Sequence, residues 1–288
     1  MNSLQKKEFE LLQLLIDICE QLGLTYYLVC GSALGAVKYK GFIPWDDDID
    51  IALPRKDYNI LLNKAFTVLP ENVFLQNYHT DPNCPFFFSK LRDSNTTFIE
   101  KNVKNIKMNH GVYIDVFPID GYPDGILSAK VLEIRKAILT WKINSAFDIK
   151  KDQKFITKMI LMLEKLCGCD RRTVKYTSKL DNLLSKYDIK TSKLMCNYGN
   201  WQGKLEYAPR EQYGKGIQAE FEELKVIIPE KYEDYLTQKY GDWRSDIPDE
   251  EKHGHHYCEV CDLSRSYLFY CDPLIKSKEK TDSNSTGN

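Results

Sequence analysis

Residues 3–22 show a helical pattern, in which apolar side chains recur every three or four positions and Gly23 follows as a stop signal. The pattern then changes to short β-branched and aromatic runs, which are typical of strands. These runs predict strands at residues 25–30, 49–53, 73–78, 86–91, 96–100 and 112–117. A short helix is expected at 33–39, and another helix follows Pro54. This order predicts an α+β fold, with a mixed sheet that carries its helices on one side.

The second half of the chain has a different pattern. Lysine-rich helical sequence with few turn signals begins near residue 126, and it indicates a helical insertion or cap. A polar, apolar-poor segment ends the chain and is typical of disorder. We therefore expect a catalytic core at 1–125, a helical insertion at 126–195, a C-terminal part that completes the catalytic domain at 196–272 and a disordered tail at 273–288.

Composition narrows the class of protein. The chain has 288 residues, 43% of them hydrophobic, and a formal net charge of −1. This balance is ordinary for a globular enzyme and gives no general attraction to nucleic acid, which we do not expect as a partner. Nine scattered cysteines and a polar helical N-terminus favour a reducing, cytoplasmic location. No apolar run has the length of a membrane span, which leaves peripheral membrane contact open.

The most informative stretch is residues 43–51, IPWDDDIDI, with four carboxylates in five positions. Such crowding is unfavourable unless a cation neutralises part of the charge. In an extended segment Asp48 and Asp50 share one face, and hard oxygen ligands suit Mg²⁺ or Mn²⁺. Asp46 is expected to assist as an additional ligand, and Asp47 to point elsewhere. A solvated acidic turn explains the run less well, because Asp50 lies within the hydrophobic strand pattern.

Two further strands carry charges in unusual places. Asp115 lies in the apolar run VYIDVF, so it needs a metal or a paired cation. A third carboxylate beside Asp48 and Asp50 would complete a site for one or two divalent ions, which can stabilise an in-line phosphoryl displacement. The alternative for Asp115 is a structural salt bridge to Lys90 or Arg92. These two cations, which alternate on one strand face, are expected to hold phosphate oxygens, or else to protect an exposed edge strand.

Gly31-Ser32 lies where a predicted strand passes into a helix. Glycine lets a phosphate approach the backbone, and a helix N-terminus offers free N–H groups. The pair therefore predicts a phosphate cradle, and a simple helix N-cap is the alternative.

Several segments together resemble one family. They are residues 31–38 (GSALGAVK), 41–50 (GFIPWDDDID), 90–93 (KLRD), 114–121 (IDVFPIDG) and 240–243 (YGDW). In these segments the sequence is similar to the LicD family, which includes the relatives of fukutin and fukutin-related protein. This family belongs to the nucleotidyltransferase superfamily that includes DNA polymerase β. The resemblance covers roughly residues 5–122 and 205–256, and the helical middle does not contribute to it.

The resemblance implies a nucleotidyltransferase-like core and a Mg²⁺-dependent phosphotransferase. The expected reaction moves phosphocholine, or a similar phospho-alcohol, from a CDP-linked donor, with CDP-choline favoured, and releases CMP. The acceptor would be a sugar hydroxyl of a cell-surface glycan or glycolipid of the teichoic acid or lipopolysaccharide type. Asp48, Asp50 and Asp115 become the catalytic residues and metal ligands, while Gly31-Ser32 binds phosphate. A nucleotidyltransferase that moves a nucleoside monophosphate, and an inactive glycan- or nucleotide-binding scaffold, are the alternatives.

Three further positions are candidate contacts to substrate, and one of them lies in a candidate site for a second metal. Lys38 lies in the first matching segment, and Trp45, beside the acidic run, is a candidate for an aromatic box around a quaternary ammonium. His255 is a candidate contact to the donor phosphates. Its neighbourhood also has a composition that could bind Zn²⁺, through His253, His255, His256, Cys258 and Cys261.

Overall fold

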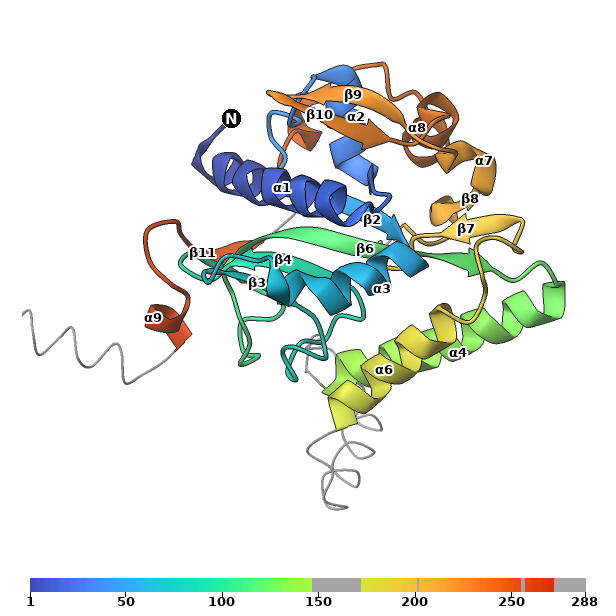
Figure 1. Ribbon diagram of the computed structural model, residues 1–288, viewed down its shortest axis with the longest axis horizontal. Coiled ribbons are helices and arrows are strands. Elements are labelled where there is room, and N and C mark those ends of the chain that lie inside the picture. Colours follow the sequence, from blue (N-terminus) through green and yellow to red (C-terminus); the bar gives the residue numbers. More distant parts are fainter. Residues whose placement is uncertain (147–171, 201, 255–256, 272–288) are drawn as a thin grey trace, which may run out of the picture.

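The computed structural model describes residues 1–146, 172–200, 202–254 and 257–271 (Figure 1). Helix α1, Ser3–Leu22, coincides with the predicted helix. The Asn2 side chain accepts from the Gln5 backbone, while the Gln5 side chain accepts from the Asn2 backbone, a reciprocal cap of the helix start. Gly23, with φ 63°, ends the helix in the left-handed conformation that glycine adopts without strain.

A mixed sheet with the strand order β1–β2–β6–β4–β3 forms the centre of the molecule. Its only parallel pair along that path is β2–β6, and the other pairs are antiparallel. The α+β prediction is therefore confirmed. The strands are β1 Tyr27–Leu28, β2 Asp50–Pro54, β3 Val73–Gln76, β4 Ser89–Asp93 and β6 Val112–Tyr122.

The apolar face of this sheet packs against helices. Helix α1 contacts β6 and β4, and helix α3, Arg55–Lys64, contacts β2 and β6. Ile51 and Val116, which are register partners, are fully buried in the main core together with Leu12 of α1. Because side chains alternate along a strand, Asp50 and Asp115 lie on the opposite face from Ile51 and Val116. Helices α1 and α3 thus pack on the apolar face of the sheet, and Asp50 and Asp115 lie on the other face.

The middle of the chain forms a pair of helices, α4 (Ile126–Ala146) and α6 (Arg172–Leu184), which pack against each other (Figure 1). They share a small hydrophobic core of their own, which includes Leu132, Leu180 and Leu184. The helical character predicted for the insertion is thus present at both of its described ends. Residues 147–171 and the predicted tail lie outside the described residues.

The C-terminal part returns to the sheet at several places. Strand β7 (Leu194–Cys196) pairs with the end of β6 and with β8 (Tyr207–Pro209), and β11 (Cys258–Asp262) pairs with β5 (Thr97–Glu100). Helix α8 packs on helix α2, and β9 and β10 form a hairpin. The remaining elements are α2 Cys30–Lys38, α7 Arg210–Tyr213, β9 Ile217–Phe221, β10 Leu224–Ile228, α8 Tyr232–Tyr240 and α9 Leu268–Cys271. These contacts agree with a C-terminal part that completes the core, although the exact domain bounds stay a prediction.

Candidate active site

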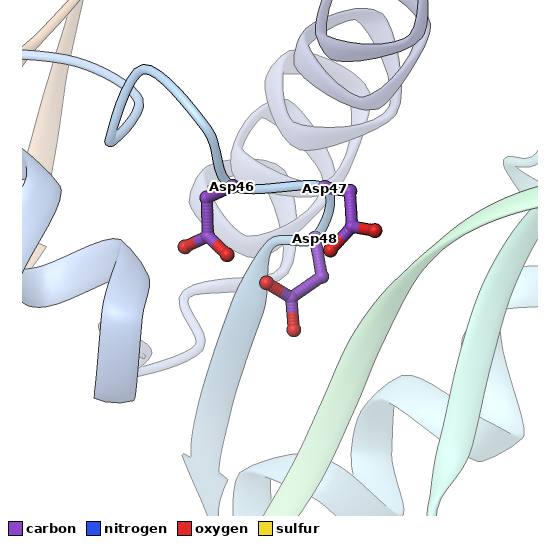
Figure 2. A group of neighbouring side chains, drawn as sticks. All are labelled: Asp46, Asp47 and Asp48. Atoms are coloured by element: carbon purple, nitrogen blue, oxygen red, sulfur yellow. The ribbon is translucent and has the colours of Figure 1, made fainter. Parts of the chain in front are cut away.

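The acidic run is a loop that leads into β2. The strand begins only at Asp50, so residues 46–49 do not have the strand geometry that would alternate their side chains. Asp46, Asp47 and Asp48 instead turn toward one another, and one carboxylate oxygen of each lies within 4.8 Å of the others (Figure 2). The expectation that Asp47 points elsewhere is therefore wrong. Pro44 and the turn around it are the sequence signal that argues against an extended run.

Crowding changes the proton affinity of this loop. Burial, the charge of Asp48 and a hydrogen bond between the two carboxyl groups raise the pKa of Asp46 to about 8. A carboxyl group with this pKa keeps its proton at neutral pH unless a cation replaces it. The loop therefore has the electrostatics of a site that binds a positive charge.

Two contacts hold the loop in place. The Gln5 amide of α1 donates to the backbone carbonyl of Asp46 at 3.0 Å and is 3.4 Å from that of Ile43. On the other side, a Cβ at Gly31 would lie only 2.8 Å from Oδ2 of Asp46. A side chain at position 31 would therefore force the Asp46 carboxylate to move.

Ser32 connects the same helix to the start of β2. Its Oγ accepts a hydrogen bond from the backbone N–H of Asp50 at 2.8 Å. The N-cap position of α2 is Val29, so the helix-cap alternative for Ser32 is wrong. Gly31 and Ser32 lie in the first turn of α2, where Gly31 contacts Asp46 and Ser32 fixes Asp50. Their role as a phosphate cradle stays a prediction.

Asp50, Asp115 and Lys90 form a row across three neighbouring strands. Asp50 of β2 is the register partner of Asp115 of β6, and Asp115 is the partner of Lys90 of β4. Register partners point to the same face, so the predicted neighbours Asp50 and Asp115 do come together. Asp48 lies instead with Asp46 and Asp47 in the preceding loop. The predicted ligands therefore form two groups. Asp48 belongs to the loop cluster, and Asp50 and Asp115 form a pair on the strands that begins directly after this loop.

Lys90 is the cation of this row. Its Nζ lies 2.8 Å from Oδ1 of Asp115, 4.0 Å from Glu100 and 3.4 Å from the centroid of the Tyr113 ring. The salt bridge that was the alternative for Asp115 is therefore present. A lysine can nevertheless exchange its partner when a phosphate or a metal approaches, since its stem is flexible.

Arg92 lies deeper than Lys90. Its side chain is fully buried, its Nε donates to Gln76 and its Nη1 donates to the carbonyl of Gly111. Strand β4 lies between β3 and β6, so the exposed-edge alternative for Lys90 and Arg92 is wrong. The partners of Arg92 give it a structural task, and its predicted contact to substrate remains untested.

The other predicted contacts lie around the acidic loop. Lys38 Nζ lies 2.7 Å from the carbonyl of Ser245 and 3.1 Å from Asp246, so it anchors the segment after α8. Trp45 is half-buried, packs edge-on against Tyr39 and has the ammonium of Lys252 at 5.6 Å from its ring. This aromatic pair already contacts a cation, which is what an aromatic box requires.

The histidine-rich segment approaches the acidic loop at one point. A Cβ at Gly254 would lie 2.5 Å from Oδ2 of Asp47, so the two are in contact. His255 and His256 lie outside the described residues. Cys258 and Cys261 share a hydrogen bond, but within the described chain neither they nor His253 belong to a group that could hold a metal. Zinc at this segment remains a prediction.

A cluster behind helix α2 was not foreseen from the sequence. Cys30, with φ 53°, has a left-handed conformation that is uncommon outside glycine, and its N–H donates to the hydroxyl of Tyr235 at 3.0 Å. Lys239 forms a buried ion pair with Glu206 beside the Cys30 thiol. Burial raises the pKa of that thiol, so it stays protonated. The only sequence signal was the neighbouring YGDW segment at 240–243.

The donors in the acidic loop fit a hard divalent cation. They are all carboxylate oxygens, and one from each residue lies close enough to the others to share one ion. The raised pKa of Asp46 agrees with a concentration of negative charge in this loop. Asp46, Asp47 and Asp48 would hold the ion. Asp50 follows them at the start of β2, and Asp115 is its partner on the neighbouring strand β6.

Comparison with known proteins agrees with this arrangement. The family described as LicD/FKTN/FKRP, nucleotidyltransferase domain, matches residues 23–166, which is half of the chain and includes the acidic loop, β2 and β6. This chain belongs to the LicD family. The family resemblance and the expectation of a LicD-type phosphotransferase are thereby confirmed.

Individual relatives differ in how far they match. The chain is 26% identical over 255 residues to the lipopolysaccharide cholinephosphotransferase LicD of Haemophilus influenzae, covering 84% of this LicD member and 91% of the relative. An uncharacterised protein of Rickettsia typhi is 27% identical over 179 residues, covering 53% and 57% of the two chains. A second one, from Rickettsia prowazekii, is 42% identical over 55 residues, covering 18% and 21%.

Proposed function

We propose that this LicD member transfers phosphocholine from CDP-choline to a sugar hydroxyl of a lipopolysaccharide-type glycolipid and releases CMP. The observation that carries the proposal is the acidic loop beside the Asp50–Asp115 pair, in a chain similar along most of its length to a lipopolysaccharide cholinephosphotransferase. A teichoic-acid-type glycan and another CDP-alcohol are the variations that the same chemistry allows.

Mg²⁺ or Mn²⁺ would supply the charge that draws electron density from the donor diphosphate. The residues of this chain do the rest by positioning. Ser32 holds the backbone of Asp50, and Gly31 leaves room for Asp46, so the loop keeps its carboxylates on one side. In phosphoryl transfer this kind of preorganisation is most of what the protein contributes.

Proton transfer belongs to the carboxylate next to the ion site. Asp115 is held by Lys90 at 2.8 Å, and its side chain is almost fully buried. When Lys90 turns to a phosphate oxygen, Asp115 becomes the acceptor for the proton of the attacking sugar hydroxyl. The same movement gives the transferred phosphate a cation at the moment when its charge is redistributed.

The choline group requires a site for a quaternary ammonium. Trp45 and Tyr39 form an aromatic pair next to the acidic loop, and Lys252 already places a cation against the Trp45 ring. We assign the choline methyl groups to this pair, where the negative charge of the loop adds to the attraction of the rings.

The described chain contains no helix with the length and apolar character needed to cross a membrane. We place the protein in the cytoplasm because its nine cysteines are scattered without a disulfide pattern, and we propose peripheral contact to the membrane that carries the acceptor.

The decisive experiment incubates the protein with Mg²⁺, a lipopolysaccharide acceptor and a panel of CDP-choline, CDP-glycerol and CDP-ribitol, and measures CMP. Release of CMP from CDP-choline alone, with choline appearing on the acceptor, is the expected result. Pyrophosphate or a nucleotidylated acceptor would instead establish a nucleotidyltransferase. Absence of any product with all donors would leave a binding scaffold and overturn the proposal.

A further inference from the structure

Helix α4 carries an apolar surface that the described part of the chain leaves exposed. Its apolar side chains recur at intervals of four and three residues, which places them in one stripe along the helix. The exposed fractions reach 76% for Leu127 and 61% for Ile134. We call this set the α4 stripe; its members are Leu127, Val131, Ile134, Ile138 and Trp141. At 1.5 Å per residue the stripe is about 21 Å long.

Basic residues border the stripe. Two grooves of about 630 and 470 Å³ run between α4 and α6, and their walls combine stripe residues with three cations. Those cations are Arg135, Lys179 and Lys186, all exposed, and among the described residues no acidic side chain lines either groove. We call the stripe together with these cations the α4–α6 face.

The two helices carry a positive net charge, whereas the whole chain is close to neutral. Helices α4 and α6 contain seven basic and two acidic residues, whereas the chain as a whole has a net charge of −1. Glu133 pairs with Lys136 on α4 itself, and Asp181 pairs with Arg55 of α3. One basic residue is thus neutralised within α4, and the two helices keep an excess of positive charge.

An exposed apolar stripe with cations beside it is the arrangement in which a helix lies flat on an anionic membrane surface. Trp141 adds the aromatic side chain that anchors such helices at the headgroup level. A second copy of the chain is the weaker fit, because it would bring two positive faces together.

We propose that the α4–α6 face docks the protein on the surface of an anionic membrane, with the α4 stripe in the headgroup boundary and the three cations on lipid phosphates. The inference deepens the proposed function, on which its purpose rests, because a lipid-linked acceptor lies at such a surface.

The test uses flotation of the full chain with vesicles of phosphatidylcholine, with and without phosphatidylglycerol. We expect binding to the vesicles that contain phosphatidylglycerol, with a decrease as salt is added. Leu127→Glu and Ile134→Glu should reduce the bound fraction at least about tenfold, since each removes apolar area and adds repulsion. Lys179→Glu should reduce it at least about fivefold.

Phe66→Glu is the matched control. Phe66 is 78% exposed, as apolar and as accessible as the stripe residues, and lies on the 3-10 turn Ala65–Thr67 after α3. Its substitution should leave vesicle binding unchanged. An equal loss in Phe66→Glu would show that binding is nonspecific, and this result overturns the proposal.

Other outcomes identify a different occupant of the face. If the protein does not float, and Leu127→Glu lowers its melting temperature by several degrees, the stripe is covered by another part of the chain. If it is a dimer that Ile134→Glu converts to a monomer, the face joins two copies. Either result overturns membrane docking. CMP release with a soluble, delipidated acceptor glycan measures the proposed function separately, because it needs no membrane and should be unchanged in the stripe variants.

Discussion

The acidic face of the sheet and the α4–α6 face both carry charged side chains, but these are buried on the first face and exposed on the second. On the sheet, Lys90, Asp115 and Asp50 are buried and held by register partners, rings and hydrogen bonds. On α4 and α6, Arg135 and Lys179 are exposed beside apolar side chains. Buried charges keep a fixed geometry because leaving them unpaired is costly, whereas exposed charges are free to meet a partner. The first arrangement suits chemistry and the second suits docking.

Substitution of Asp50 should have the largest effect on activity. Asp50→Asn keeps the size of the side chain but removes a negative charge beside the loop, so turnover should fall about 10³-fold or more. Asp48→Asn should behave in the same way. CMP release measures the loss, and circular dichroism checks the fold. Asp17→Asn, on the exposed side of α1, is the control. Wild-type rates in both site variants would remove these aspartates from the mechanism.

Removal of Lys90 should have the largest effect on stability. Lys90→Met keeps the stem but leaves Asp115 and Glu100 without this cation, at a cost of about 3–5 kcal/mol in the free energy of unfolding. Urea unfolding measures it. The same exchange at Lys179, Lys179→Met, should change the free energy by less than about 0.5 kcal/mol, because that side chain is exposed. Equal costs at the two positions would contradict the contrast between the faces.

Ser32 tests how the loop and β2 are joined. Ser32→Ala leaves the buried N–H of Asp50 without its acceptor, which should cost about 1–3 kcal/mol in stability. Turnover should fall as well, because the start of β2 carries the acidic pair. Thermal unfolding and CMP release measure the two effects. A variant that loses stability with undiminished turnover would show that Asp50 does not depend on this bond.

The pH dependence of metal binding should report on Asp46. Its pKa, raised to about 8 by burial and by Asp48, lies above the ordinary value of 3.8. Such a group contributes stability that is complete below about 3.8 and is lost as the pH rises through about 8, so the metal-free protein should become less stable in that interval. Mg²⁺ should therefore raise the melting temperature most above pH 8, where no proton has to be displaced. In Asp46→Asn both trends should flatten, and an unchanged pH profile would contradict this assignment.

The smallest expected effect concerns the reactivity of the Cys261 thiol. A hydrogen bond from Cys258 lowers the pKa of Cys261 to about 7, so iodoacetamide should modify it near neutral pH. Cys258→Ala, which removes the donor, should move the midpoint of this reaction upward without affecting CMP release. Protection of Cys261 by added Zn²⁺ would instead support the zinc site that the sequence suggested.

Local apolar patterns were enough to predict strands β1, β2, β3, β4 and β6, whereas β7 and β8, which extend the same sheet, were not predicted. Strands 112–117 and 73–78 differ from β6 and β3 only in where they end, because the period of two and the β-branched residues act locally. The local pattern was not enough to predict the position of Asp48, which was expected on one strand face with Asp50. The predicted strand begins only one residue before β2, but the turn of Asp46, Asp47 and Asp48 toward one another depends on the turn at Pro44 and on the hydrogen bond from Gln5. A contact from α1 cannot be read from the sequence around Asp48.

The sequence by itself determined the family, the fold class and the carboxylates from which the site is built, since these follow from local patterns and residue types. Only the tertiary structure decided which carboxylates meet. It brought Asp47 to Asp46 and Asp48, paired Asp50 with Asp115, and buried Arg92 against Gln76 and Gly111. It also separated the chain into a face whose charges are fixed and a face whose charges are exposed. Pairing and burial depend on segments far apart in the chain, so no pattern within one segment could specify them.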